Sequence, residues 1–394
     1  YNLSPETLLE PSDYTDAMRD ILNQGVNVEK LLKQEINLKE SGLKDATLTP
    51  NGQFFRTDKR GFLPKMMEEM YEDRKKFKNL MIKCQQDYQI EKDPQRKKEL
   101  EKLIARYNNL QLAKKVSLNS AYGAMGSQYF RFYDLRVALA VTLAGQLSIR
   151  WIEKKLNEFM NKLLKTEEDY VIASDTDSIY LRLGNLVNKV FPDEKDTKKI
   201  VAFMDKVCEE KIQLFIDKSY EELAIYVHAF SQKMQMKREA LADKGIWTAK
   251  KRYALNVYNN EGVAYNEPKL KVMGLEMVKS STPSVIREKM REVLKLMMTG
   301  TEDDVHKFID DFKIDFMKLP AEEISSPRGC NGIAQYSDSV TLYKKGTPIH
   351  VKGAILYNFY LKKLDLEKQY PLIQEGEKLK FIYLKMPNTI KDSV

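Results

Sequence analysis

Residues 64–88 contain no glycine and no proline after Pro64, and this stretch predicts one long helix. Asp93 and Pro94 come soon after and suit the N-cap and the first turn of a second helix. We expect that helix to run to Gly123, a residue type that commonly ends helices. Two long charged helices joined by a short polar tip predict an antiparallel hairpin that projects from the rest of the fold.

The remaining segments predict a mixture of helices and strands. Residues 2–62 carry turn signals and indicate loops and short elements rather than one long helix. Further helices are predicted at residues 136–164 and 197–227, a strand–turn–strand at 170–184, and a strand at 252–259. The fold class that follows is α+β.

The sequence marks both ends of a further helix, between about residues 283 and 299. Thr282 suits its N-cap, Pro283 its first position and Gly300 its end. We place a domain boundary near Ser280, just before this helix. A chain of 394 residues is long enough for two or three domains.

Composition excludes several classes of protein. Hydrophobic residues make up 43% of the chain and aromatic residues 10%, which is typical of a folded protein rather than a disordered one. The three cysteines and three histidines are scattered, so neither a disulfide framework nor a zinc site is expected. No uninterrupted apolar stretch is long enough to cross a membrane, and we expect no membrane segment. A net charge of +8 permits a polyanionic partner.

Two aspartates, Asp175 and Asp177, interrupt the apolar runs of the predicted strand–turn–strand. Residues two apart in a strand point to one face, and with a turn at Thr176 both carboxylates still project from one end of a hairpin. Mg²⁺ prefers oxygen ligands and is usually held by one or two carboxylates plus substrate phosphates. The alternative is an ordinary turn, because aspartate side chains bond the nearby backbone. This pattern alone leaves both interpretations open.

A polar line is predicted on the second long helix. Lys115, Asn119 and Tyr122 fall at i, i+4 and i+7, along one face. A cation, an amide and an aromatic ring in line can meet a phosphate, a sugar edge and a base, and Gly123 leaves room for a flat ligand. The alternative is a helix with a solvated lysine and a packed tyrosine.

The first long helix carries Arg74 and Lys78 at i and i+4. Arginine offers a planar fork for phosphate oxygens, and lysine offers a compact charge. A solvated helical face with ordinary ion pairs is the alternative.

Lys250, Lys251, Arg252 and Tyr253 form a basic cluster immediately before a predicted strand. Such cations neutralise nucleic-acid phosphates, and an aromatic ring can stack on a base. A solvated basic turn would explain the same residues.

In this order, the motifs resemble those of family B DNA polymerases, of the replicative type found in T-even-like phages. "DTDSIY" at residues 175–180 resembles motif C of that family, "KKVSLNSAYG" resembles motif B, and "KKRYALNVY" resembles its primer-contacting motif. "KVMGLEMVKSSTP" at residues 271–283 is similar to the palm-to-thumb junction. The resemblance covers essentially the whole chain.

The resemblance implies roles for individual residues. Asp175 and Asp177 would hold magnesium, with Glu239 nearby as a further metal ligand. Lys115 would bind the triphosphate and act as a catalytic residue by stabilising charge on the leaving group. The remaining implied contacts are Arg74, Lys78, Asn119, Tyr122 and Gly123 to the nucleotide, and Thr176, Lys250, Lys251, Arg252 and Tyr253 to DNA.

The architecture implied by the resemblance is an α+β polymerase palm with a long antiparallel helical fingers hairpin and a mostly helical thumb. The palm would comprise residues 1–62 and 124–279, and the fingers residues 63–123. The thumb would comprise residues 280–394, truncated at its C-terminus.

Two departures from the family pattern change the expected function. Motif A, a D-x-x-S-L-Y-P-S type stretch with another metal-bridging aspartate, does not occur, and "YNLSPETLLE" resembles the segment just after it. Lys237 stands where phage relatives often carry an acid. We therefore expect a polymerase fragment without motif A or the exonuclease domain, which is inactive or weak alone.

The implied reaction is template-directed transfer of deoxynucleoside triphosphates to a primer 3′-hydroxyl, with two Mg²⁺ ions. The implied partners are primer–template DNA, the nucleotide, an N-terminal exonuclease portion as a separate chain, and a sliding clamp bound through a tail that this chain lacks. The location would be the cytoplasm of a bacterial host.

A second hypothesis is the C-terminal, DNA-binding subunit of a split polymerase, inactive without its N-terminal partner. A nucleotidyl cyclase or a reverse transcriptase is a third possibility, since both use palm carboxylates. The basic cluster and the long hairpin argue against both.

Overall fold

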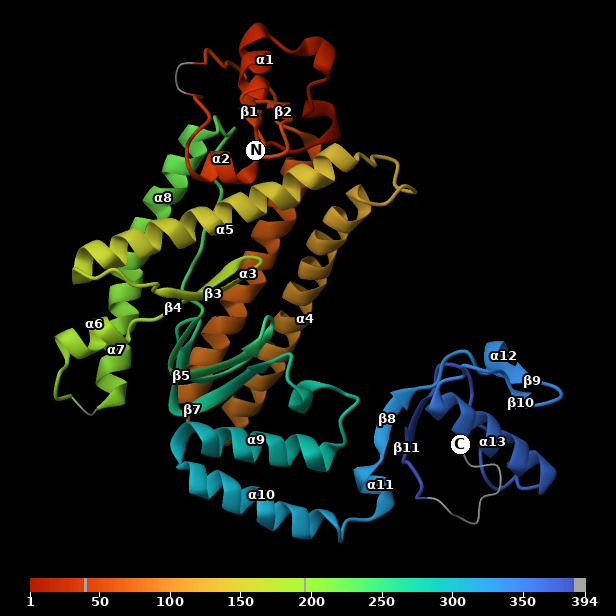
Figure 1. Ribbon diagram of the computed structural model, residues 1–394. Coiled ribbons are helices and arrows are strands. Elements are labelled where there is room, and N and C mark those ends of the chain that lie inside the picture. The colour runs from red at the N-terminus through yellow and green to blue at the C-terminus, as the bar shows by residue number, and fades with distance from the viewer. Residues whose placement is uncertain (39–40, 195, 386–394) are drawn as a thin grey trace. The chain divides into compact units, whose positions relative to one another are not determined.

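The computed structural model describes residues 1–38, 41–194 and 196–385 (Figure 1). The chain divides into two compact units, one of residues 1–243 and 257–269 and the other of residues 244–256 and 270–394. Both contain helices and antiparallel strands, and the predicted α+β class is confirmed. The domain limits at residues 62, 123 and 279 stay predictions. The predicted end of the thumb, at residues 386–394, lies outside the described residues.

The N-terminal part of the first unit contains short elements, as predicted. Two 3₁₀ turns, Pro5–Thr7 and Pro11–Asp13, precede the first helices. The elements that follow are α1 (Asp16–Asn23), α2 (Val28–Leu32), β1 (Ala46–Leu48) and β2 (Phe54–Arg56), with β1 and β2 antiparallel.

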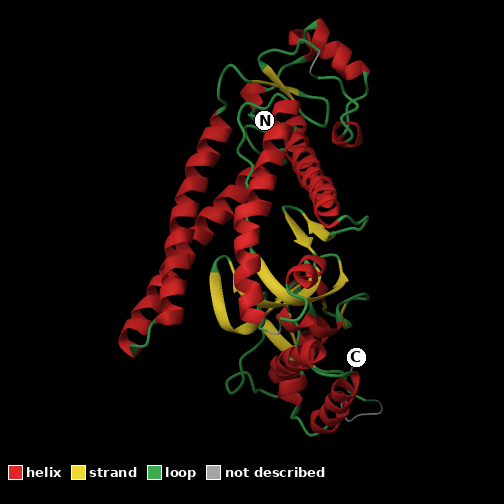
Figure 2. Ribbon diagram, turned by 90° about the vertical axis from the view of Figure 1, so that its left-hand side faces the viewer, coloured by secondary structure: helices red, strands yellow, loops and turns green. Residues whose placement is uncertain are grey.

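The predicted helical hairpin is present, and we call it the arm. It consists of α3 (Phe62–Ile90) and α4 (Pro94–Met125), which lie side by side (Figure 2). Asp93 caps α4 as expected, accepting hydrogen bonds from the backbone N–H groups of Gln95 and Arg96. Across the hairpin, Lys114 Nζ lies 2.6 Å from a carboxylate oxygen of Asp73.

The prediction that Gly123 ends the second helix is wrong. The helix continues through Met125, and Gly126 is the C-cap. Glycine inside a helix costs only about 1 kcal/mol relative to alanine. Met125 is buried with Phe55, Leu63 and Val137, and this packing outweighs that cost.

The largest core of the first unit is organised around α5 (Leu135–Leu164). Trp151 and Leu156 are buried on its inner face, and the Trp151 indole N–H donates to the carbonyl oxygen of Ser219 at 2.9 Å. The predicted helix at residues 197–227 is present with one wider turn. It comprises α7 (Thr197–Val207), a π-helical turn (Cys208–Ile212) and α8 (Gln213–Tyr226).

One described helix is long and apolar on average, although it contains no uninterrupted apolar stretch of membrane-spanning length. Among the described helices, α5 is long and apolar enough to cross a bilayer, with a mean hydropathy of 1.3 over its most apolar 18-residue window. Of that window, 44% is buried inside the protein. A core helix meets the same criterion, and the buried positions of α5 explain its apolar character.

The predicted strand–turn–strand is confirmed. It consists of β3 (Val171–Asp175) and β4 (Ser178–Leu181), an antiparallel pair followed by α6 (Gly184–Val190). Both strands pack against α5 (Figure 1). Asn157 of α5 accepts hydrogen bonds from the backbone N–H groups of Tyr170 and Val171, at 2.8 and 3.0 Å. Because a two-stranded hairpin is marginal by itself, α5 holds β3 in place.

A three-stranded sheet has the order β5–β6–β7. Its strands are β5 (Ala240–Ala249), β6 (Arg252–Asn260) and β7 (Val263–Met273), so the predicted strand at residues 252–259 is confirmed. Glu261 and Gly262 form the turn between β6 and β7 and belong to the first unit.

The second unit is built mainly from short helices. Its elements are a 3₁₀ turn (Glu276–Val278), α9 (Ser284–Thr299), α10 (Glu302–Phe316), α11 (Ala321–Ile324), β8 (Ser326–Gly329), α12 (Ile333–Tyr336), β9 (Ser337–Asp338), β10 (Leu342–Tyr343), α13 (Ile349–Lys363) and β11 (Lys378–Phe381). Strand β11 pairs with β8, and β10 pairs with β9.

The predicted start of α9 is wrong by one residue. Pro283, not Thr282, is the N-cap, and its carbonyl oxygen accepts from the N–H of Arg287. Proline has no N–H to contribute to a helix, and its carbonyl serves the cap position equally well. Gly300 follows the last helical residue, as expected.

Candidate functional site

The aspartate hairpin forms a two-residue turn at the end of β3. Asp175 pairs with Ser178 in the register, and Thr176 and Asp177 make the turn. The N–H of Asp177 donates to the carbonyl oxygen of Asp175 at 2.6 Å, an i to i+2 hydrogen bond. Thr176 has a φ of 52°, which is uncommon for a β-branched residue.

The same turn fixes the side chain of Asp175. The Thr176 hydroxyl donates to an Asp175 carboxylate oxygen at 3.0 Å, and the Ser178 hydroxyl donates to the Asp175 carbonyl oxygen at 3.2 Å. Asp175 is half-buried, whereas Asp177 is exposed. A strained, hydrogen-bonded turn therefore carries two carboxylates at neighbouring positions, and strain of this kind is often found at functional sites.

The donors of this hairpin suit a hard cation. Two carboxylates are what Mg²⁺ usually takes from a protein when substrate phosphates complete its shell. Within the described residues, no three His, Cys, Asp or Glu side chains gather closely enough to hold a metal. Glu239 is therefore not brought to the aspartates as a third ligand, and its metal role stays a prediction.

The arm presents the predicted polar line on α4. Lys115, Asn119, Tyr122 and Gly123 are all exposed, and Tyr122 retains 42% of its surface. Among the residues that the structure describes, Lys115 has no ion-pair partner, unlike its neighbour Lys114. The Lys114 ammonium also lowers the pKa of Asp73.

On α3, the two predicted cations are half-buried and differ in their contacts. The Arg74 Nε is buried without a hydrogen-bond partner in the described part of the chain. Lys78 forms an ion pair with Glu261, in the turn between β6 and β7. The sequence-predicted cations are therefore present on the arm, and one of them is already engaged.

The predicted basic cluster forms the turn between β5 and β6, in the second unit. Lys250 and Lys251 are exposed turn residues. Arg252 bonds both carboxylate oxygens of Glu276, and the Tyr253 ring stacks on Trp247 with centroids 6.2 Å apart. Two cations of the cluster thus face solvent, while Arg252 serves an ion pair.

Sequence comparison gives these features a family. The sequence model of DNA polymerase family B matches residues 1–390. The chain belongs to DNA polymerase family B. The resemblance of its motifs to that family is thereby confirmed.

Three relatives illustrate the relationship. The DNA-directed DNA polymerase of Escherichia phage RB69 is 33% identical over 392 residues, covering 87% of this chain and 43% of the relative. That of Enterobacteria phage T4 is 36% identical over 304 residues, covering 75% and 33%. DNA polymerase 1 of Saccharolobus solfataricus is 27% identical over 254 residues, covering 63% and 23%. The family B chain thus spans less than half the length of these relatives.

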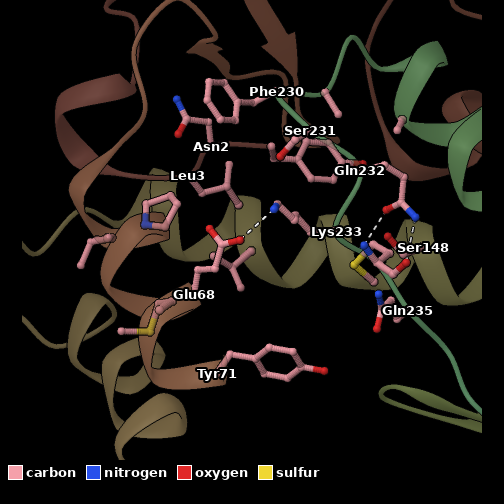
Figure 3. A pocket seen from close by; sticks show the side chains of 18 of the residues that line it. Asn2, Leu3, Glu68, Tyr71, Ser148, Phe230, Ser231, Gln232, Lys233 and Gln235 are labelled. Atoms are coloured by element: carbon pink, nitrogen blue, oxygen red, sulfur yellow. Dashed lines mark hydrogen bonds and ion pairs between the residues drawn. The ribbon is translucent and has the colours of Figure 1, made fainter. Parts of the chain in front are cut away.

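Sequence reasoning missed a pocket at the base of the arm. It has a volume of 840 Å³ and lies within the first unit (Figure 3). Tyr71 and Tyr122 line it from the two arm helices. Lys233, in the loop after α8, reaches Glu68 of α3 at 2.7 Å. The sequence of that loop has no periodicity or motif that would have indicated its contact with the arm at this pocket.

Proposed function

We propose that this family B chain provides the metal-binding and nucleotide-binding part of a DNA-directed DNA polymerase. The reaction is transfer of a deoxynucleoside triphosphate to a primer 3′-hydroxyl, directed by a template. One observation carries the proposal: a strained turn bears Asp175 and Asp177 in the same compact unit as a helical arm that carries Arg74, Lys78 and Lys115. The two phage relatives named above are DNA-directed DNA polymerases.

The two aspartates would hold magnesium, with the substrate phosphates as further ligands. Bound at this turn, two magnesium ions would lower the pKa of the attacking 3′-hydroxyl and neutralise the departing pyrophosphate. The chain's own contribution is positional. The hydrogen bonds around Thr176 fix the Asp175 side chain, and α5 fixes the strand that carries it.

The arm would bind the triphosphate. Lys115 is exposed and has no ion-pair partner among the described residues, so a phosphate is a suitable counterion for its ammonium. The buried Nε of Arg74 is a donor that a phosphate oxygen would satisfy. Asn119, Tyr122 and Gly123 would contact the sugar and the base from the same face of α4. Movement of the arm toward the aspartates would gate the reaction.

The turn between β5 and β6 would contact the primer–template duplex. Lys250 and Lys251 are exposed and suit phosphate contacts, which fix position without reading sequence. Arg252 and Tyr253 would support this turn, and Thr176 would approach the primer end. In this assignment the arm is the fingers, residues 1–62 and 124–279 form the palm, and residues 280–394 form the thumb.

The site is short of donors, and this shapes the proposal. Among the described residues no third carboxylate joins the two aspartates, and two carboxylates alone hold two metal ions weakly, so we expect little primer extension by this chain alone. A further aspartate, from another segment or from a second polypeptide, would complete the site. The alternative is then a DNA-binding subunit of a split polymerase. Action in a host cytoplasm and binding of a sliding clamp belong to the same proposal.

The test is primer extension with magnesium, a labelled primer and either DNA or RNA as template. The chain is assayed alone and with the purified N-terminal half of a phage relative. Extension on DNA that appears or rises strongly on mixing supports the proposal. Fast extension by the chain alone contradicts the missing-donor argument. No extension and no duplex binding under any condition contradicts the polymerase assignment.

A further inference from the structure

Within the described part of the chain, Lys78 is the one cation assigned to the triphosphate that has a carboxylate partner. Its ammonium bonds a carboxylate oxygen of Glu261, and both side chains are mostly buried, with 33% and 24% of their surfaces exposed. The two residues lie 183 positions apart in the chain. This ion pair connects the arm to the turn between β6 and β7, within the first unit.

A second contact joins the same two elements. The Gln86 side-chain amide donates to the carbonyl oxygen of Gly262 at 3.1 Å. Lys78 and Gln86 are two turns apart on α3, so both reach the turn from one side of the helix. The arm is therefore attached to the sheet at two adjacent points.

The turn that receives these contacts is rigid. Glu261 and Gly262 have φ values of 51° and 83°, as in the two-residue turns that suit β-hairpins. The N–H of Glu261 donates to the carbonyl oxygen of Glu239 at 2.6 Å, and the N–H of Gly262 donates to the Asn259 side chain at 3.1 Å. Asn259 is in turn held by Arg238, at 2.8 Å. The Glu261 carboxylate is thus presented from a fixed backbone.

Other ion pairs lie wholly inside the arm, whereas Lys233–Glu68 joins the base of α3 to the loop after α8. Lys114 and Asp73 join α3 to α4 inside the arm, and Arg96 and Glu99 lie within α4. Neither pair would be broken if the arm moved as a body. The Lys78–Glu261 pair would be broken, and Lys78 is also a residue that the triphosphate needs.

We propose that Glu261 is a positioning residue that occupies Lys78 in the absence of nucleotide and so holds the arm on the β6–β7 turn. An incoming triphosphate then competes with the Glu261 carboxylate for the Lys78 ammonium. Replacement of the Glu261 carboxylate by a phosphate at Lys78 removes the charged one of the two contacts between the arm and the β6–β7 turn. This inference depends on the proposed function for the triphosphate, but the attachment itself does not.

The test uses Glu261→Gln, which keeps the shape of the side chain and removes its charge. Glu99→Gln is the matched control, because it breaks an ion pair that lies inside α4. Hydrogen exchange of residues 74–90 and 257–267 is measured without nucleotide. Binding of magnesium–dATP is measured separately by equilibrium dialysis.

In Glu261→Gln we expect the backbone amide hydrogens of both segments to exchange with solvent roughly two- to fivefold faster. This is the size of effect expected for loss of a modest ion pair. We also expect this variant to bind magnesium–dATP roughly two- to fivefold more tightly, because Lys78 is released. A purely structural role for Glu261 would weaken binding instead. The control should change neither quantity.

A charge exchange separates attachment from binding. The double variant Lys78→Glu with Glu261→Lys restores the ion pair with opposite polarity. Its amide hydrogen-exchange rates should therefore return toward those of the parent protein, while its binding of magnesium–dATP should stay weak. Unchanged exchange in Glu261→Gln, or unchanged or weaker dATP binding, would overturn the inference. If no chain binds dATP but exchange rises, the attachment is supported and the proposed function is what fails.

Discussion

The carbonyl oxygen of Lys251 lies 2.1 Å from the position that a β-carbon on Gly274 would occupy. Gly274 also has a φ of +67°, so two independent constraints require glycine there. Through this contact the segment after β7 supports the turn that carries Lys250 and Lys251.

Gly274→Ala should destabilise the second unit by clearly more than the roughly 1 kcal/mol expected from a positive φ alone. Gly346→Ala is the control, because Gly346 has a φ of +85° but nothing within 4 Å of its β-carbon position. Urea unfolding of both variants gives the comparison. Equal losses for the two would show that the close approach to Lys251 carries no cost.

Asp175→Asn and Asp177→Asn should each abolish the stabilisation that magnesium gives the chain. A ligand that binds only the folded state raises its stability, and this effect disappears with the binding site. The melting temperature with and without magnesium is the measurement, and Asp303→Asn on α10 is the control. In an assembly that extends primers, we also expect a rate loss on the order of 100-fold or more. Retention of the magnesium shift by both variants would contradict the assignment.

Lys115→Ala should raise the dissociation constant of magnesium–dATP about 10- to 100-fold. A hydrogen bond to a charged group contributes roughly 1.5–3 kcal/mol, and each 1.4 kcal/mol is tenfold in affinity. Lys97→Ala tests a lysine on the same helix that lies 5.5 Å from the Tyr88 ring centroid. Equilibrium dialysis should detect no change for this control. An equal loss in both variants would indicate only a general effect of charge.

Leu156→Ala should cost the first unit about 2–5 kcal/mol of unfolding free energy, because it opens a cavity in the core around α5. Leu163→Ala, on the same helix with 49% of its surface exposed, should cost less than about 1 kcal/mol. Urea unfolding followed by tryptophan fluorescence reports on Trp151 in this core when all chains also carry Trp247→Phe. A small effect of Leu156→Ala would show that the core rearranges to fill the space.

Burial raises the pKa of Tyr220 to about 12. A pKa raised in the folded state means that the stabilising contribution is complete below the unfolded value near 10 and is lost as pH rises toward 12. Unfolding free energy should therefore fall between pH 10 and 12, and Tyr220→Phe should reduce that slope. Tyr129→Phe, at an 89% exposed position, is the control. The same slope in Tyr220→Phe and the parent protein would contradict this.

The elements that could be predicted are those whose signals are local. The absence of glycine and of proline after Pro64 predicted α3, and Asp93 with Pro94 predicted the start of α4. Gly123 and Thr282 misled because helix ends depend on tertiary packing, such as that of Met125, and on which residue's carbonyl accepts the first bond. Hydrophobic periodicity and the residues that cap or break helices therefore predicted the type of each element, but not every boundary.

For the candidate site, too, the local features could be predicted and the long-range contacts could not. The aspartate turn was predictable because both carboxylates belong to one short segment. The partners of the arm were not, because Glu261 lies 183 positions from Lys78, and Lys233 lies 165 positions from Glu68. No motif marks those partners, and only folding brings them together.

The Asn157 side chain accepts hydrogen bonds from the N–H groups of Val171, the first residue of the strand that ends at Asp175, and of Tyr170 just before it. The position of the two aspartates thus depends on α5, whose inner face buries Trp151 and Leu156 in the core. If the proposed metal site is correct, alterations deep in that helix should be transmitted along β3 and change the affinity for divalent ions at its far end.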